Sequence, residues 1–228
     1  MLICPTEIRL SSLLEANVLS PKNYAMIGIR NEKTTALRTF LATSNPFTAG
    51  SEPGAFSYVP YSNVSFIRNS CIDSLNWSNQ TGKEIFLNPK YGYSTALGAN
   101  DVLLCKDANI GDTCLFIPQE GRQYAISSGV VRLNFAEEQY KYYCLAFLRD
   151  AYFVSQLDAK TPKGSTIRHA GTGFLDCLIP TIGNAERKLL PLIESLTKNI
   201  AYAERVSLAK LEAACSLIEA DFLRKTET

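Results

Sequence analysis

The chain has 228 residues, of which 46% are hydrophobic and 20% are charged, with 23 Lys and Arg against 22 Asp and Glu. This composition excludes a disordered or low-complexity chain, and the length is sufficient for one or two domains with a real core. The net charge of +1 gives no global attraction to nucleic acid or to an anionic membrane, so any such binding must come from a local patch.

Seven cysteines are spread through apolar stretches without a C-x-x-C pair, which excludes the usual zinc and redox motifs. They fit buried thiols in a reducing compartment. The first twenty residues carry Glu7, Arg9 and Glu15 where an export signal needs an uninterrupted apolar core. No apolar run approaches the roughly 18 residues of a membrane helix. We therefore expect a soluble, cytoplasmic protein without a membrane span.

Short runs rich in Val, Ile, Tyr, Phe and Thr, separated by Gly, Pro and Asn, fill residues 20–135 and are typical of strands and loops. The predicted strands are Tyr24–Ile29, Tyr58–Phe66, Ile85–Leu87, Asp101–Cys105, Cys114–Ile117, Tyr124–Ser127 and Val130–Phe135. The stretch Thr43–Pro60 holds three of the ten prolines and predicts an irregular but ordered loop. Loops of this length usually have a function.

The hydrophobic period changes at Glu137, where apolar residues begin to recur every three or four positions. The residues that share this face are Tyr140, Cys144, Phe147, Ala151 and Val154. This spacing predicts a helix over Glu137–Leu157, which the segment Thr161–Gly164 ends. A short strand over Phe174–Ile179 follows.

From Asn184, which can act as an N-cap, no glycine appears before the end of the chain, and this predicts one long helix. Its apolar stripe consists of Leu189, Ile193, Leu196, Ile200, Ala203, Ser207, Leu211, Ala214, Ile218 and Phe222. Such a stripe needs a cover. One interpretation is a coiled-coil arm that pairs with a partner helix, and the other is a terminal helix folded onto its own domain. The predicted fold class is α+β: a mixed, sheet-rich body over residues 1–183 and a helical arm over 184–228.

Catalytic motifs are weak throughout the sequence. His169 is the only histidine, and no nucleophile elbow accompanies it. Lys163–Thr166 has the letters of a phosphate-binding loop in the wrong order. Asp150, Asp158 and Lys160 are the nearest approach to a metal-dependent nuclease centre, but this motif belongs on a strand and here falls in a helical pattern. We predict no catalytic residue and no metal ligand, and the pattern favours a solvated helix face.

Polar side chains suited to DNA occur at several places along the body. Arg and Asn can pair with base edges, while Lys, Ser and Thr suit phosphates. The candidate DNA-binding residues are Arg30, Asn31, Arg68, Asn69, Lys106, Asn109, Lys163, Ser165, Thr166, Arg168 and His169. Because residues 1–183 carry 16 basic and 15 acidic groups, folding would have to create the patch. Ordinary solvated loops are the alternative interpretation.

Several blocks, in their order along the chain, resemble the target-recognition domain of a type I restriction-modification specificity subunit. The blocks are Tyr24–Asn31, Leu97–Asp112, Ser127–Leu133, the helix around Tyr140–Leu157, Lys163–His169, Leu178–Pro180 and the long charged helix. The resemblance covers about residues 20–225, and it depends on the joint order of the blocks more than on any single one.

The resemblance implies a non-catalytic DNA reader that recognises one half of a bipartite double-stranded target. The helix would serve as a spacer that docks methyltransferase (M) subunits, and the restriction (R) subunit would join them. The stripe residues Leu189, Ile193, Leu196, Ile200, Leu211 and Ile218 would carry the partner contacts. S-adenosylmethionine, ATP and Mg²⁺ would be needed only in the partner subunits, so we expect no cofactor in this chain.

The sequence departs from the family in one main respect. Members usually carry two recognition domains and two such helices, whereas this chain has one of each and resembles a half-subunit. Two copies could pair their helices about a two-fold axis, which predicts a homodimer, although a fragment or a split gene product would look the same. Two rival interpretations stay open: a small nuclease built on Asp150, Asp158 and Lys160, and a coiled-coil adaptor that binds no DNA.

Overall fold

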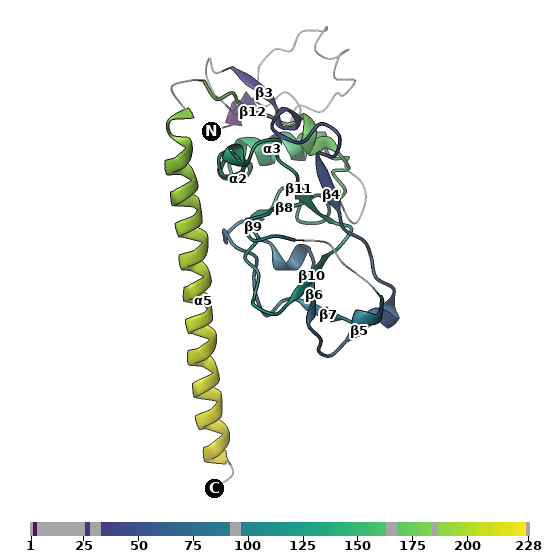
Figure 1. The fold of residues 1–228 in the computed structure, drawn as a ribbon, viewed down its shortest axis with the longest axis vertical. Helices are drawn as coiled ribbons and strands as arrows, with labels where there is room; N and C mark the ends of the chain where they lie inside the picture. The colour runs from purple at the N-terminus through teal and green to yellow at the C-terminus, as the bar shows by residue number, and fades with distance from the viewer. Residues whose placement is uncertain are drawn as a thin grey trace.

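The computed structural model describes residues 2–3, 26–27, 33–91, 97–162, 168–183 and 187–226, with side chains of the last helix up to Glu219. A body of small sheets and short helices lies beside the single long helix α5 (Leu190–Thr226), which runs along one side of the body and continues past it (Figure 1). The predicted mixed α and β body with a long C-terminal helix is therefore confirmed.

Two four-stranded sheets form the body. The first has the order β4 (Phe47–Ala49), β11 (Val130–Leu133), β8 (Val102–Cys105), β9 (Thr113–Leu115), and all its pairs are antiparallel. The second has the order β10 (Gln123–Ile126), β6 (Val64–Ile67), β7 (Ile85–Leu87), β5 (Tyr58–Val59), with β10 and β6 parallel. Two further antiparallel pairs are β3 (Thr34–Ala36) with β12 (Leu178–Pro180) and β1 (Leu2–Ile3) with β2 (Met26–Ile27).

The first sheet is covered on both faces, which explains its sequence. Val102 and Leu104 belong to the core cluster that includes the short helices, while Leu103 and Cys105 belong to the cluster shared with the second sheet. A strand buried on both faces reads as a continuous apolar run instead of an alternating one. All four residues of β8 are buried accordingly.

The predicted helix over Glu137–Leu157 is wrong in its continuity. The structure has a 3₁₀ turn, then α2 (Lys141–Leu148) and α3 (Ala151–Lys160), with a break between them. Asp150 has extended backbone angles and its carboxylate accepts a hydrogen bond from Tyr152 N at 2.7 Å, so it caps α3. The apolar spacing continues across the break and therefore hides it.

Several strand predictions needed correction at their ends. Ile85–Leu87 is confirmed as β7, but the predicted strand Tyr58–Phe66 is two strands, β5 and β6, separated by a turn. The Thr43–Pro60 stretch is not a loop throughout, because it contains β4, a 3₁₀ turn at Ala55–Ser57 and β5. Half of the predicted strand Phe174–Ile179 is a 3₁₀ turn, and β12 follows it.

Cysteines behave largely as the sequence predicts. Within the described residues, those inside the body are buried and free: Cys71, Cys105, Cys114, Cys144 and Cys177. Burial raises the pKa of these thiols, which keeps them protonated. Cys215 on α5 is exposed, contrary to the prediction of burial.

One face of α5 packs on the body. Leu190, Thr197 and Ala201 are buried there. Glu204 accepts hydrogen bonds from the backbone N and the Oγ of Ser78, both at 2.8 Å, and Arg205 donates to Asn79 O at 3.0 Å. Both apolar packing and specific polar contacts therefore hold the helix against its own body. None of the helices in the described part of the chain has the length and apolar character needed to cross a bilayer.

Gly50 provides a test of this packing. A Cβ on Gly50 would lie 2.0 Å from Ile126 O and 2.3 Å from Ser127 O, whereas a Cβ on Gly54 would meet nothing within 4 Å. We expect Gly50→Ala to lower the free energy of unfolding by about 1–3 kcal/mol, because backbone must move. Gly54→Ala should change it by less than about 0.5 kcal/mol. Urea denaturation of both variants checks this prediction. Equal unfolding midpoints for Gly50→Ala and Gly54→Ala would contradict the close contact of Gly50 with Ile126 and Ser127.

Candidate nucleic-acid interface

Four segments that are far apart in the sequence meet at one place on the body. They are Arg68–Asn69 after β6, the β8–β9 turn, the β10–β11 turn at Ser127–Gly129, and Arg168–Ala170. We call their polar side chains the polar cluster: Arg68, Asn69, Lys106, Asp107, Asn109, Ser127, Ser128, Arg168 and His169. The structure therefore brings together the described members of the predicted DNA-binding set.

Backbone hydrogen bonds hold these segments together. Lys106 N and Asp107 N both donate to Gly129 O, at 2.9 and 3.3 Å. Ala108 N donates to Arg168 O at 3.0 Å, and Ala170 N donates to Lys106 O at 2.8 Å. The β8–β9 turn is therefore fixed on both sides by main-chain contacts.

Asn69 has a positioning role within the polar cluster. Its amide Nδ2 donates to Asp107 O, and its Oδ1 accepts from Ser127 Oγ at 3.4 Å. A Cβ on Gly129 would lie 2.6 Å from Asn69 Oδ1, so a side chain at position 129 would force the Asn69 amide to shift. Since both ends of the amide are used within the protein, we expect Asn69 to hold the turns in place and not to contact a base.

Cations and carboxylates alternate across the polar cluster. Asp107 lies between two basic side chains, with Oδ2 at 3.0 Å from Lys106 Nζ and Oδ1 at 2.9 Å from His169 Nδ1. Arg168 forms an ion pair with Asp158 of α3. Arg68 is exposed. A phosphate could compete with Asp158 for Arg168, since a partly exposed ion pair contributes only about 0–1 kcal/mol.

The exposed side chains at the edge of the polar cluster are those of Arg68, Asn109 and His169. Ala108, beside Asn109, has φ of 56°, which gives this turn its sharp bend. The remaining predicted DNA-binding residues, Arg30, Asn31, Lys163, Ser165 and Thr166, lie outside the described residues.

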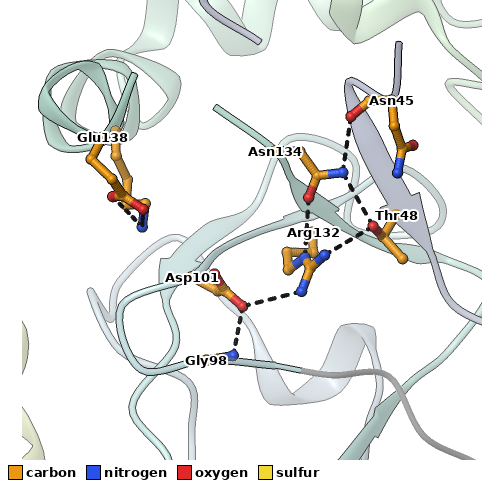
Figure 2. A network of polar contacts seen from close by, with 8 residues as sticks. Asn45, Thr48, Gly98, Asp101, Arg132, Asn134 and Glu138 are labelled. Carbon is orange, nitrogen blue, oxygen red and sulfur yellow. Dashed lines mark hydrogen bonds and ion pairs between the residues drawn. The ribbon is translucent and has the colours of Figure 1, made fainter. Parts of the chain in front are cut away.

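A second polar network, whose residues no sequence motif indicated, links the blocks Leu97–Asp112 and Ser127–Leu133 (Figure 2). Arg132 on β11 lies 3.7 Å from Asp101 Oδ2 and donates to Thr48 Oγ1 and Asn134 Oδ1, each at 3.2 Å. Asp101 also accepts from Gly98 N at 2.7 Å. Because these groups bond one another and lie half-buried, the network supports the sheet edge.

The suggested nuclease residues do not converge. Asp150 caps the start of α3 and Asp158 lies eight residues further along, which corresponds to about 12 Å of helix. Asp158 pairs with Arg168, and Lys160 is the last residue of α3. Two carboxylates that bind one metal ion must both lie within a few ångströms of that ion. Asp150 and Asp158 are too far apart along α3 to do so, and they do not form such a centre.

Arg149 and Asp112 line a shallow depression beside the β8–β9 turn. The guanidinium of Arg149 donates to Ser74 O and Asn76 O, both at 2.7 Å, and lies 4.5 Å from the centre of the Trp77 ring. Burial raises the pKa of Asp112 to about 6; the charge of nearby Asp73 also raises it, and Arg149 opposes the shift.

No family model and no curated protein matches the chain. Solved structures do match its fold. A chain from a study of complex assembly and conformational transition of the type I R-M system matches with a TM-score of 0.51 and 15% identity, over 84% of this chain and 45% of that chain. The HsdS subunit from Thermoanaerobacter tengcongensis matches with a TM-score of 0.48 and 14% identity, over 78% of this chain and 40% of that subunit. The type I restriction-modification S subunit from M. genitalium matches with a TM-score of 0.45 and 14% identity, over 85% of this chain and 44% of that subunit.

The fold of this chain is therefore that of the type I R-M chain, as the resemblance in the sequence implied. The chain spans less than half the length of each of these solved chains.

The shifted carboxyl of Asp112 predicts a pH dependence of stability. Between about pH 4 and about pH 6 the folded protein keeps this proton while the unfolded chain, with an ordinary pKa of 3.8, loses it. The contribution of Asp112 to stability therefore falls as the pH rises through this window. We expect Asp112→Asn to raise the free energy of unfolding at pH 7 by about 1 kcal/mol, since solvent screens a half-buried charge.

Urea denaturation at about pH 4 and about pH 7 checks this prediction. The rise in the free energy of unfolding caused by Asp112→Asn should largely vanish at about pH 4. The control Glu120→Gln, at an exposed turn, should change stability at neither pH. An equal effect of Asp112→Asn at both values would contradict the proposed burial of this carboxylate.

Proposed function

We propose that this chain is a DNA specificity subunit of a type I restriction-modification enzyme, with one recognition body and one helical arm. The observation that carries the proposal is the convergence of four separate polar turns into the polar cluster, on a body whose fold matches a chain of the type I R-M system. In this proposal the polar cluster contacts one half of a bipartite double-stranded target.

The chemistry of the polar cluster suits this role. Exposed Arg68 and Asn109 carry forked groups that can pair with guanine and adenine edges in the major groove. Arg168 is held beside the partly exposed carboxylate of Asp158, and a DNA phosphate could replace that carboxylate at modest cost, whereas Lys106 pairs with the more deeply buried Asp107. Such phosphate contacts release counterions, so binding should weaken steeply with salt.

The arm has a second apolar face that the body leaves uncovered. Leu196, Ile200, Leu211 and Ile218 are exposed, and they lie about a quarter of a turn away from the buried face of Thr197 and Ala201. Ile193, by contrast, is half-buried against the main core, so it contributes less to this face than the spacing predicts. The exposed face is the surface on which we propose that partner helices pack.

We propose that two copies pair through this face about a two-fold axis, and that M subunits dock on the resulting arm. A closed symmetric dimer is the commonest way to cover a self-complementary patch. Two identical bodies would then read a bipartite target with symmetric halves. Methylation with S-adenosylmethionine, and cleavage driven by ATP and Mg²⁺, would belong to the M and R subunits.

The proposed target reading can be tested by co-expression. We would co-express this chain with type I M subunits in a host without other type I enzymes and map modified bases across its genome. A bipartite motif with symmetric halves is the expected result, and it would support both DNA specificity and pairing of two copies. Co-purification without any modification would contradict DNA reading by this body.

Arg68 provides the residue-level test. On a duplex that carries the mapped motif, Arg68→Ala should weaken binding of the methyltransferase complex about 5- to 150-fold, which corresponds to about 1–3 kcal/mol. If affinity falls only for duplexes that carry the motif, Arg68 contacts a base. If affinity falls equally for all sequences, Arg68 contacts a phosphate. Lys83→Ala removes the same charge from an exposed position of the body outside the polar cluster and should leave binding unchanged. Equal affinities of wild type and Arg68→Ala would overturn this role.

The exposed face of α5 predicts the oligomeric state. At micromolar concentration, light scattering should give a dimer for the wild-type chain and a monomer for Ile218→Glu, because a charge would enter the apolar interface. Ser216→Glu adds the same charge two positions earlier, on nearly the opposite side of the helix, and should stay dimeric. A wild-type monomer, alone and with M subunits, would exclude the two-fold arrangement.

A further inference from the structure

The contact between the arm and the body has two parts of different character. In the first third of α5, Leu190 and Ala201 are buried against the body, and Lys198 Nζ lies 5.0 Å from the centre of the Tyr142 ring of α2. Further along, the arm contacts the body through hydrogen bonds to residues 78–82, which we call the 78–82 loop. Apolar packing is not directional, whereas a hydrogen bond needs a defined geometry. The second part therefore determines the direction of the arm more sharply.

Three charged side chains of α5 contact the 78–82 loop in succession. Glu204 is half-buried, and its carboxylate accepts from the backbone N and the Oγ of Ser78, both at 2.8 Å. Hydrogen bonds to an ionised group are shorter and stronger than neutral ones, so the Glu204 contact is the central one of the three. The other two pairs are Arg205 with Asn79 O at 3.0 Å and Glu212 with Thr81 Oγ1 at 3.1 Å.

The 78–82 loop is itself fixed to the first sheet. Asn79 is fully buried, and its Oδ1 accepts from Ile117 N at 2.8 Å. Ser78, the residue that Glu204 contacts, forms a parallel bridge with Leu115 of β9. The loop is therefore held in a constant position relative to β9.

β9 also leads to the polar cluster. The β8–β9 turn carries Lys106 and Asn109 and is followed directly by β9, whose last residue is Leu115. The bridge to Ser78 is thus separated from the polar cluster by one short strand of the buried sheet. The direction of the arm is thereby coupled to the position of the polar cluster.

We propose that Glu204, through Ser78, is a positioning residue that sets the angle between the arm and the body, and thereby the number of base pairs between two half-targets. This proposal rests on the proposed function, since it requires that the polar cluster reads DNA and that the arm joins two recognition bodies. In such an assembly the separation of the two polar clusters depends on how the arms pair and on how each body is oriented on its arm. The contact of Glu204 with the 78–82 loop fixes this orientation.

The length of the arm gives the size of the effect. Packed helices cross at angles that scatter by about 15–20°. Glu212 lies about 15 residues beyond Thr197, which is about 22 Å of helix, so a tilt of about 15° at Thr197 would move Glu212 by about 6 Å. The hydrogen bonds to the 78–82 loop do not survive such a displacement. One base pair occupies about 3.4 Å of the duplex, so a body that tilts by this amount would accept spacers that differ by about one base pair.

The test maps modified bases in the co-expression host for the wild-type chain and for Glu204→Ala, each with the type I M subunits. The wild type should modify a bipartite motif with one spacer length. Glu204→Ala should keep both half-sequences and add motifs with a spacer one base pair shorter or longer, because the body is no longer held at one angle. A general loss of stability would lower modification at all sites alike and would not change the spacer.

Two further variants serve as controls. Glu204→Gln keeps an oxygen that can accept from Ser78, so it should retain the single spacer of the wild type. Glu194→Ala removes a carboxylate whose partner at 2.6 Å, Lys198, belongs to α5 itself, and it should also retain the single spacer. Equal spreads of spacer length in Glu194→Ala and Glu204→Ala would overturn the specific role of Glu204.

A measurement without DNA reports the angle directly. Spin labels on Cys215, which is exposed on the arm, and on Glu120→Cys in the body give a distribution of distances between arm and body. The labelled chain also carries Cys4→Ser, which avoids a third label, and Ile218→Glu, which removes distances between two copies. Adding Glu204→Ala should broaden the distribution, and an unchanged width would contradict the proposed positioning.

The outcomes separate this proposal from the proposed function. If the wild type modifies a bipartite motif and Glu204→Ala keeps its single spacer, the positioning role is wrong and the proposed function stands. If Glu204→Ala and Glu204→Gln both abolish modification, Glu204 is needed for folding or assembly, and the positioning role is again wrong. Absence of any modified motif with the wild-type chain would overturn both.

Discussion

The carbonyl of Gly129 is the point on which the arrangement of the polar turns depends. It accepts hydrogen bonds from Lys106 N and Asp107 N, and the absence of a side chain at Gly129 leaves room for the amide of Asn69. Asn69 then bonds the carbonyl of Asp107. Three turns that belong to two different sheets are thereby fixed relative to one another. The side chains of Arg68 and Asn109 are exposed at the edge of the polar cluster that these turns form.

The sheets beneath these turns are stable for a simple reason. β8 is buried on both faces, between the short helices on one side and the second sheet on the other. Apolar burial on this scale is the main source of stability in a domain of this size. The turns at the ends of the strands contribute little to it, so their side chains can be polar and exposed.

Much of the fold could be predicted from the sequence, because strand and helix periodicity depend on local burial. β7 was predicted to the residue, and the long helix α5 was predicted from the lack of glycine and the apolar stripe. The break between α2 and α3 was missed, since Asp150 caps without interrupting the apolar spacing. Strand β4 within the Thr43–Pro60 stretch was also missed, because its pairing with β11 is a long-range contact.

The candidate site was only partly predictable. Arg68, Lys106 and Arg168 were predicted because side chains of these types suit DNA. The sequence around each of them does not indicate that their turns meet in the fold. The internal use of Asn69 and the network around Arg132 depend on partners more than thirty residues away. Such pairings arise from the topology of the two sheets, and short-range patterns do not encode them.

The reliance of the turns on main-chain hydrogen bonds has a consequence for how the protein can evolve. The bonds at Gly129, Ala108 and Ala170 are made by peptide groups, so residue type is restricted chiefly at Ala108, whose φ is 56°, and at Gly129, which lies against Asn69. Neighbouring exposed positions such as Arg68 and Asn109 can therefore accept new residues without loss of the scaffold. The surface chemistry at the edge of the polar cluster can therefore change while the fold beneath it stays the same.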